Sequence, residues 1–462
     1  MVNIKPKIGI EIHGYLTTKE KLFCRCSADY KNANPNTNIC PVCTGQPGCK
    51  PMAPNIEAIK KCIAIALMLD CKINNKLIWQ RKHYDWADLP KGYQNTISGA
   101  YSIPLAEFGK FNDVIIRECH LEEDPAKWDP ETGKIDYNRC GVPLIEIVTE
   151  PDFSSSKQVR EWLNQLIIML SYIKAVDKDA GIKADINISV NVNGKNGERV
   201  EIKNLNSMYS IEKAIDYEIL RQSSLLEKGE LIKRETRTFD ELTKSTIAMR
   251  GKELAEDYRF IPDPDLPILE IKSELIDEIK KTLPESPNAK IQRFIEEYGI
   301  DDAAAKVLAS DIELANLFDS VAKKTNSKLA AYWITIELLR VLNWNKKTLK
   351  EVSINPEHFI ELLNLIEKKE ITELAAKKML NDFIPISFSP LTKLKKVSRI
   401  DSRSELKKIC QKIIKKFPCA VEDYKNGQEK ALFFLVGEVM KETDRRADSK
   451  ITLEILKKLL LS

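Results

Sequence analysis

Three short segments in the first third of the chain place histidine or carboxylate side chains at spacings that suit chemistry. In Gly9-Ile10-Glu11-Ile12-His13 the residues alternate as in a strand, so Glu11 and His13 project from the same face. The other two segments are His120-Leu121-Glu122-Glu123-Asp124 and Leu144-Ile145-Glu146-Ile147-Val148-Thr149-Glu150. Alternation in the last segment puts Glu146, Val148 and Glu150 on one side.

Carboxylates at inward positions of an apolar strand need a partner, because an unpaired buried charge is costly. The usual partners are Arg or Lys side chains, or a divalent cation. A site rich in oxygen ligands and water suits Mg²⁺, which commonly bridges to substrate phosphates. Two alternatives stay open from the residues alone: solvated strand faces with ordinary salt bridges, and clusters that belong to different sites.

Two close pairs of cysteines, Cys24/Cys26 and Cys40/Cys43, are separated by 13 residues. Four thiolates can surround one tetrahedral Zn²⁺, and the loop between the pairs is long enough to bring them together. Because four protein ligands leave no open position, we expect a structural zinc. The first pair has the less common C-x-C spacing, and burial of the cysteines as small hydrophobic residues is the alternative.

The 462 residues, 43% of them hydrophobic, are enough for several domains. The 72 basic and 68 acidic residues nearly balance, so net charge neither requires nor excludes nucleic acid. Lysines concentrate in the last third at Lys393, Lys395, Lys396, Lys407, Lys408, Lys412, Lys415 and Lys416. RNA phosphate contact and solvated helix faces both explain such a concentration. No segment resembles a signal peptide or a membrane span, and eleven cysteines suit thiols and metal ligands, so we expect a soluble cytoplasmic protein.

Local patterns predict strands and helices together in the first part of the chain. Residues 185–192 alternate polar and apolar side chains, and the glycine-rich segment after them predicts a hairpin with residues 199–203. One helix is predicted from the capping serines at 154–156 to about residue 175. A second is predicted from about residue 211 to 228, ending at Gly229.

Proline-rich segments at 261–267 and 283–287 separate this region from a chain that is helical almost throughout. We therefore predict an α+β protein with three domains. Residues 1–284 form a cradle of antiparallel sheet and helices, residues 285–398 an all-α domain, and residues 399–462 a small helical tail.

Ordered motifs over essentially the whole chain resemble those of one family, the B subunits of the aspartyl/glutamyl-tRNA amidotransferases and their archaeal E-subunit relatives. Besides the segments above, they are Asp88-Leu89-Pro90-Lys91-Gly92-Tyr93-Gln94, Asp136-Tyr137-Asn138-Arg139, Glu201-Ile202-Lys203-Asn204-Leu205-Asn206-Ser207, Asp257-Tyr258-Arg259-Phe260 and Pro264-Asp265-Leu266-Pro267. Leu435-Val436-Gly437-Glu438 and Arg446-Ala447-Asp448 resemble the tail shared with YqeY-like proteins. The E subunit carries an inserted domain after the Asp-Tyr-Arg segment; here Leu269 leads directly into helices, so the chain resembles the B type.

The resemblance implies a ligase that uses ATP and Mg²⁺ to phosphorylate the side-chain carboxylate of Glu-tRNA(Gln), Asp-tRNA(Asn) or both. Ammonia released from glutamine by an amidase A subunit then displaces phosphate and leaves an amide. The implied assembly is a heterotrimer with that A subunit and a small C subunit, and the tail is implied to contact tRNA.

The family motif assigns roles to individual residues here. It puts Mg²⁺ on Glu11, His13, Glu123 and Glu146, and makes Glu122, Asp124 and Glu150 candidates for a second ion or for the ammonia path. The remaining motif residues are candidates for binding ATP or aminoacyl-tRNA, with structural roles as the alternative: Lys91, Arg139, Lys203, Asn204, Asn206 and Arg259.

Departures from the family pattern affect the details of nucleotide and acceptor-end binding. Pro125-Ala126-Lys127 follows the two glutamates and the aspartate where Ala-Gly-Lys is usual, and Lys183-Ala184-Asp185 stands where Arg-Cys-Asp is usual. The main alternative function is a non-catalytic, zinc-stabilised tRNA-binding protein whose acidic strands serve only folding.

Overall fold

The structure, a computed structural model, describes residues 3–84, 86–177, 183–249, 259–394, 400 and 402–461. The chain divides into two compact units, Met1–Ser286 and Pro287–Ser462. The motif residues Asp257 and Tyr258, the lysines Lys395 and Lys396, and the predicted 398/399 boundary lie outside the described residues. Among the helices of the described ranges, none is both long and apolar enough to cross a membrane.

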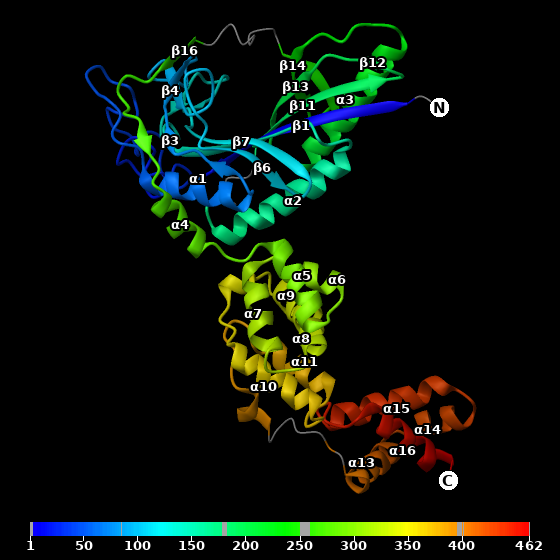
Figure 1. The fold of residues 1–462 in the computed structure, drawn as a ribbon. Helices are drawn as coiled ribbons and strands as arrows, with labels where there is room; N and C mark the ends of the chain where they lie inside the picture. Colours follow the sequence, from blue (N-terminus) through cyan, green and yellow to red (C-terminus); the bar gives the residue numbers. More distant parts are fainter. Residues whose placement is uncertain are drawn as a thin grey trace. The chain divides into compact units, whose positions relative to one another are not determined.

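The first unit is built on one large sheet (Figure 1). In chain order its described strands are β1 (Ile4–Tyr15), β2 (Lys72–Ile73), β4 (Gln80–His83), β5 (Tyr93–Thr96), β6 (Ala106–Phe111), β7 (Val114–Glu123), β10 (Pro143–Thr149), β11 (Lys183–Val192), β12 (Lys195–Asn196), β13 (Val200–Leu205), β14 (Glu235–Asp240), β15 (Ser245–Ala248) and β16 (Arg259–Pro262). Two small two-stranded sheets pair β3 (Lys76–Leu77) with β17 (Leu269–Glu270) and β8 (Lys127–Trp128) with β9 (Ile135–Asp136).

The main path through the sheet runs β15-β14-β13-β11-β1-β10-β7-β5-β4-β16. The predicted strand at 185–192 is β11, and its hairpin partner at 199–203 lies within β13, which pairs with it antiparallel. The pairs along this path are antiparallel except β13 with β14, which is parallel. A parallel pair needs a crossover connection. Helix α3 (Met208–Glu227) provides it, so the predicted antiparallel sheet is a mixed one.

Each strand at the centre of the sheet has one apolar and one polar face. Along β1, Ile8, Ile10 and Ile12 are buried in the main core, whereas Glu11 and His13 occupy the alternate positions. Helices α1 (Ile56–Met68), α2 (Ser156–Ile173) and α3 contribute their buried residues to the same core (Figure 1). The helices therefore cover the apolar face and leave the polar face free for chemistry.

The predicted helices begin and end where their caps require. The Ser155 side chain accepts a hydrogen bond from the backbone N–H of Gln158 and so caps α2. The second predicted helix, α3, begins earlier than expected because Ser207 caps it in the same way. It ends before Gly229, whose φ of +79° lies in the left-handed region that glycine adopts at low cost.

Helix α4 (Ser273–Thr282) closes the first unit, and the second unit is helical. The described helices of the second unit are α5 (Pro287–Tyr298), α6 (Asp302–Leu308), α7 (Ile312–Ala322), α8 (Ser327–Tyr332), η3 (Trp333–Leu338), α9 (Leu339–Trp344), η4 (Leu349–Glu351), α10 (Pro356–Glu367), α11 (Glu373–Asn381), η5 (Pro390–Lys393), α13 (Arg403–Lys416), α14 (Pro418–Lys425), α15 (Glu429–Glu442) and α16 (Ser449–Leu461). Their buried side chains form two hydrophobic clusters, within residues 294–383 and 400–460. The predicted α+β class is confirmed.

Candidate active site

Cross-strand pairing brings two histidines to one carboxylate on the polar face of the sheet. His13 on β1 lies opposite Glu146 on β10, and Glu146 lies opposite His120 on β7. Both rings contact the same carboxylate oxygen: the Nε2 atoms of His13 and His120 lie 3.3 Å and 2.9 Å from Glu146 Oε2. Directly opposed residues on one sheet face have neighbouring Cβ atoms, so the register alone accounts for the meeting.

The charges in this group support one another. Burial disfavours imidazolium, but the carboxylate of Glu146 outweighs burial and raises the pKa of His13 to about 9. Glu146 and Glu118 together raise the pKa of His120 to about 10. Burial would raise the pKa of Glu146, yet the two imidazoles hold it well below its ordinary range.

Glu122 completes a group that can bind a metal ion. Each of His13, Glu122 and Glu146 offers one potential ligand atom, and these three atoms lie within 4.8 Å of one another. Burial and the charge of Glu146 raise the pKa of Glu122. Carboxylate oxygens with one imidazole suit a hard divalent cation that keeps some of its waters.

A second acidic group lies on the neighbouring strands of the same face. Ligand atoms of Glu11, Asp185 and Glu201 lie within 4.8 Å of one another, and Asn187 Nδ2 donates to Glu11 Oε1 at 2.8 Å. Burial, then the charges of Glu146, Glu201 and Asp185, raise the pKa of Glu11 to about 7. Closely spaced carboxylates of this kind suit cation binding.

Glu123 lies apart from the other predicted magnesium ligands. Strand alternation turns it to the face opposite Glu122, where Lys91 Nζ contacts Glu123 Oε1 and the backbone N–H of Asn95 donates to the same oxygen at 3.0 Å. The structure therefore brings Glu11, His13 and Glu146 to one face and puts Glu122, not Glu123, beside them.

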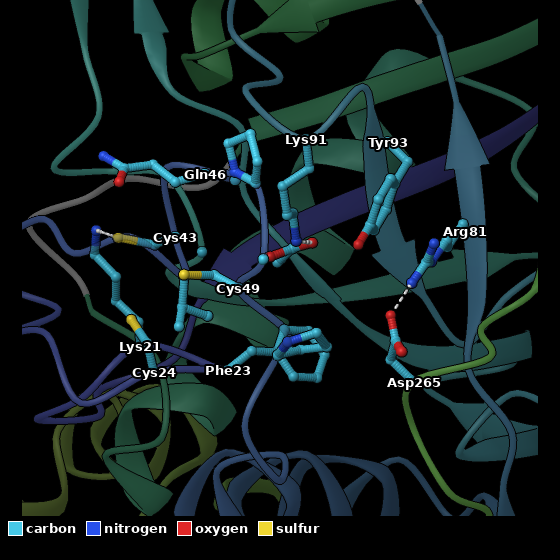
Figure 2. Close-up of a pocket in the computed structure, with 17 residues that line it drawn as sticks. Lys21, Phe23, Cys24, Cys43, Gln46, Cys49, Arg81, Lys91, Tyr93 and Asp265 are labelled. Atoms are coloured by element: carbon cyan, nitrogen blue, oxygen red, sulfur yellow. Dashed lines mark hydrogen bonds and ion pairs between the residues drawn. The ribbon is translucent and has the colours of Figure 1, made fainter.

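Glu123 and Lys91 line a cavity of about 260 Å³ (Figure 2). Tyr93 and Arg81 line one side, and Arg81 Nη2 binds Asp265 at 2.6 Å. The other side is formed by Lys21 and by the cysteine loop, residues 24–49, which carries the two cysteine pairs. The cavity is thus a polar chamber with both charge signs on its walls.

Asp124 and Arg139 form a buried pair. Arg139 Nε lies 2.9 Å from Asp124 Oδ2, and the Tyr15 hydroxyl donates to the same oxygen at 2.9 Å. The guanidinium also donates to the carbonyls of Pro125 and Ala126. The contacts of Arg139 therefore shape the turn where the chain departs from the family pattern.

The other predicted residues lie at the edges of these groups. Lys203 Nζ is 3.9 Å from Glu201, and the backbone N–H of Asn204 donates to Asp185 at 2.9 Å. Asn206 is exposed after β13, and Arg259 is exposed on β16. Glu150 follows the end of β10, beyond a shift in register at Val148/Thr149, and belongs to neither acidic group among the described residues.

Sequence reasoning did not assign His120, Asp185 or Glu201 to the site. The motif around His120 and the alternating strand that begins at Asp185 were both visible in the sequence. Their pairing partners lie far away in the chain, so only strand order shows that these side chains meet.

The four predicted zinc ligands come together. Cys24, Cys26, Cys40 and Cys43 have their sulfur atoms within 4.8 Å of one another, with Cys40 Sγ and Cys43 Sγ 3.9 Å apart. Tetrahedral Zn–S bonds of about 2.3 Å require sulfur separations of about 3.8 Å, so the group fits zinc. A hydrogen bond from Cys24, together with nearby Lys21, lowers the pKa of Cys43 to about 5.

Two protein-family models match parts of this chain. The model of the GatB/GatE catalytic domain matches residues 6–277, and that of the GatB domain matches residues 316–460. The chain is similar to proteins named as B subunits of aspartyl/glutamyl-tRNA(Asn/Gln) amidotransferase. That of Methanothermobacter thermautotrophicus is 46% identical over 98% of this chain and 99% of its own length. Those of Methanocaldococcus jannaschii and Methanopyrus kandleri are 45% and 44% identical, over 100% and 98% of this chain and 99% and 98% of their own lengths. The chain therefore belongs to the family of aspartyl/glutamyl-tRNA(Asn/Gln) amidotransferase B subunits.

Proposed function

We propose that this chain activates the side-chain carboxylate of a mischarged aminoacyl-tRNA and amidates it. The substrate is Glu-tRNA(Gln), Asp-tRNA(Asn) or both, as the names of the relatives indicate. It acts as a ligase with glutamine as amide donor, in a heterotrimer with an amidase A subunit and a small C subunit. It works in the cytoplasm, where these tRNAs are charged.

The reaction has two steps. A carboxylate resists ammonia because it would have to expel oxide, so its oxygen first attacks the γ-phosphorus of ATP and ADP leaves. Ammonia then attacks the acyl carbon, phosphate leaves with the bonding electrons, and the amide nitrogen loses its extra proton. Bound Mg²⁺ would supply charge neutralisation at the phosphates.

The single observation that carries the proposal is the convergence of His13, Glu122 and Glu146 on one face of the sheet. These residues would hold the ion, with Glu11 beside them. Phosphoryl transfer depends on positioning and electrostatics more than on covalent catalysis, and rigid neighbouring strands supply both. Glu123 takes no part in this group and is assigned to the second step.

The cavity lined by Lys91 and Glu123 suits the arrival of ammonia. A small neutral molecule can exchange hydrogen bonds with a lysine–carboxylate pair without needing a counter-ion. Asp124 and Arg139 form an ion pair within the connection between β7 and β10. We propose that ammonia from the A subunit passes this chamber, and that the Cys24–Cys43 group holds a structural zinc beside it.

Replacing Glu146 tests the proposal in the assembled complex. Glu146→Gln should lower ATP-dependent amidation of both mischarged tRNAs by about a hundredfold, the effect typical of removing one charge-stabilising group from an active site. Glutaminase activity of the A subunit should persist. Glu131→Gln, on an exposed turn, serves as the control. Full amidation by Glu146→Gln would instead support a non-catalytic, zinc-stabilised tRNA-binding protein.

A further inference from the structure

His120 occupies a buried position between two carboxylates on β7 and β10. The residue is 3% exposed, its Nε2 atom lies 2.9 Å from Glu146 Oε2, and its Nδ1 atom lies 3.4 Å from Glu118 Oε1. The Ser98 hydroxyl donates to that same oxygen of Glu118 at 2.8 Å. The contact between His120 Nδ1 and Glu118 is an ion pair without a hydrogen bond. Ser98, Glu118 and His120 thus form a chain of polar contacts that ends on Glu146.

Glu146 Oε2 is the meeting point of two imidazole rings, but the two rings are not equivalent. His13 belongs to the proposed ion-binding group, whereas His120 does not. A histidine that binds a cation presents its ring nitrogen lone pair, and the same nitrogen cannot donate to a carboxylate. If the Nε2 atom of His13 binds the ion, Glu146 loses its contact with His13 and keeps the contact with His120.

A glutamate side chain has several rotatable bonds, so a ligand of this type needs an outside partner to stay aimed at the ion. Glu146 lies directly opposite His120 in the strand register, which sets the distance between their backbones. Glu118 lies two residues before His120 on the same strand, so its side chain contacts the ring from the same face.

We propose that His120 is a positioning residue: held by Glu118 and Ser98, it fixes the carboxylate of Glu146 in the orientation that binds the divalent cation. The inference rests on the proposed function, because it takes Glu146 as a ligand. His120 itself contacts neither the ion nor the reacting atoms.

Substitution by glutamine or by asparagine tests the two ring nitrogens of His120 one at a time. Glutamine places its amide nitrogen near the position of Nε2 and can still donate to Glu146. Asparagine places its amide nitrogen near Nδ1, so it can contact Glu118 but not reach Glu146. His120→Leu fills the space with neither contact. The control is His358→Leu in the second unit, a partly buried histidine that also contacts a serine, Ser387, at 2.9 Å.

The measurement is the affinity for Mn²⁺, used as a paramagnetic substitute for Mg²⁺, by electron paramagnetic resonance of the assembled complex. The Mg²⁺ concentration for half-maximal amidation is measured alongside. We expect His120→Leu and His120→Asn to lower the Mn²⁺ affinity by about ten- to a hundredfold, the usual effect of losing a residue that orients a metal ligand. The Mg²⁺ concentration for half-maximal amidation should rise by about the same factor. Excess Mg²⁺ should recover most of the maximal rate. His120→Gln should remain within about threefold of the unchanged protein.

Equal effects of glutamine and asparagine would overturn the inference, as would unchanged ion affinity in His120→Leu. Thermal unfolding without added Mg²⁺ shows whether the leucine variant folds, and the asparagine and glutamine variants carry the test if it does not. Glu146→Gln distinguishes failure of the positioning role of His120 from failure of the proposed function. If Glu146→Gln abolishes ion binding while His120→Leu leaves it intact, the positioning role alone is wrong. If Glu146→Gln leaves ion binding intact, the proposed function is wrong as well.

Discussion

At the level of single residues, the pKa values of Glu11 and His13 are both raised. The raised pKa of Glu11, to about 7, has burial as its largest cause and three neighbouring carboxylates as further causes. His13 holds its proton to a pKa of about 9 because Glu146 is beside it. A cation that enters this group must therefore displace protons.

The first prediction concerns the pH dependence of ion binding. Ligands must be deprotonated to bind a metal, so Mg²⁺ affinity should rise from about pH 6 to about pH 9, by up to about tenfold per pH unit for each proton released. Isothermal titration in buffers with different enthalpies of ionisation measures both the affinity and the number of protons. Affinity that stays constant over this range would contradict ligation by His13 with Glu11 beside it.

The second prediction concerns stability without added Mg²⁺. The folded pKa values of His13 and His120, about 9 and about 10, lie above the ordinary value of 6.5. Their stabilisation is therefore fully present below pH 6.5 and is lost as pH rises through 9 and 10. The free energy of unfolding in urea should fall over this window. His120→Gln cannot titrate there and should flatten the slope; an unchanged slope would show that other groups dominate.

Among the elements, β7 places two adjacent residues at two different proposed sites. Its pleat turns Glu122 toward the proposed ion site and Glu123 toward the cavity with Lys91. Two isosteric changes on one strand can therefore separate carboxylate activation from ammonia delivery.

The third prediction compares these two changes. Glu122→Gln should weaken ATP-dependent amidation equally with glutamine and with added ammonium chloride, because activation precedes both. Glu123→Gln should impair the glutamine-dependent reaction by about tenfold or more while ammonium partly rescues it. Product formation with each nitrogen source, in the same complex, is the measurement. If the ratio of the glutamine-dependent rate to the ammonium-dependent rate is the same in both variants, Glu122 and Glu123 do not act in different steps.

The cysteine loop is the second element with a specific consequence. A Cβ added at Gly45, whose φ is +62°, would come within 2.7 Å of Lys91 Cγ and 2.9 Å of the Pro90 carbonyl oxygen. The loop therefore packs tightly against the lysine of the cavity, and its shape depends on the four sulfur atoms that hold it.

The fourth prediction follows from this packing. Cys40→Ser should remove the bound zinc and lower glutamine-dependent amidation, because the loop no longer holds Lys91. Cys419→Ser should change neither, since Cys419 is exposed and lies outside both the sulfur group and the cavity. Elemental analysis gives the zinc content. Unchanged zinc content in Cys40→Ser would exclude the four-cysteine site.

At the scale of the whole molecule, the lysine-rich helix α13 of the second unit is where we predict contact with tRNA. Lysines of α13 such as Lys407, Lys408 and Lys415 are exposed, while Leu406 and Ile413 face the local core. The helix therefore presents a charged face to solvent, as lysines that contact a phosphate backbone must.

The fifth prediction is that replacing Lys407, Lys408 and Lys415 by alanine weakens tRNA binding and flattens its salt dependence. Each lost phosphate contact should reduce the slope of log affinity against log salt by about one. Filter binding at several salt concentrations measures both quantities.

The matched control replaces three exposed lysines of the first unit, Lys110, Lys195 and Lys228. An equal effect of the two triple changes would mean that the second unit has no special role. Unchanged affinity in the α13 variant would leave these lysines as a solvated helix face.

Local pattern was enough to predict the α+β class, strand β11, its hairpin partner β13 and helices α2 and α3. It was also enough to bring the four cysteines into one group, because two close pairs on one loop have few other ways to meet. The parallel pairing of β13 with β14 was not predicted, since it depends on the crossover path of α3.

The sequence by itself determined which side chains share a face of a strand, since the two-residue repeat follows from backbone geometry alone. It also determined the residue types of the candidate metal sites and the resemblance to the family. Only the tertiary structure decided that Glu122 rather than Glu123 joins His13 and Glu146, and that Asp185 and Glu201 lie beside Glu11. The physical reason is that neighbours across strands depend on strand order and register, which the packing of the whole sheet on its helices sets.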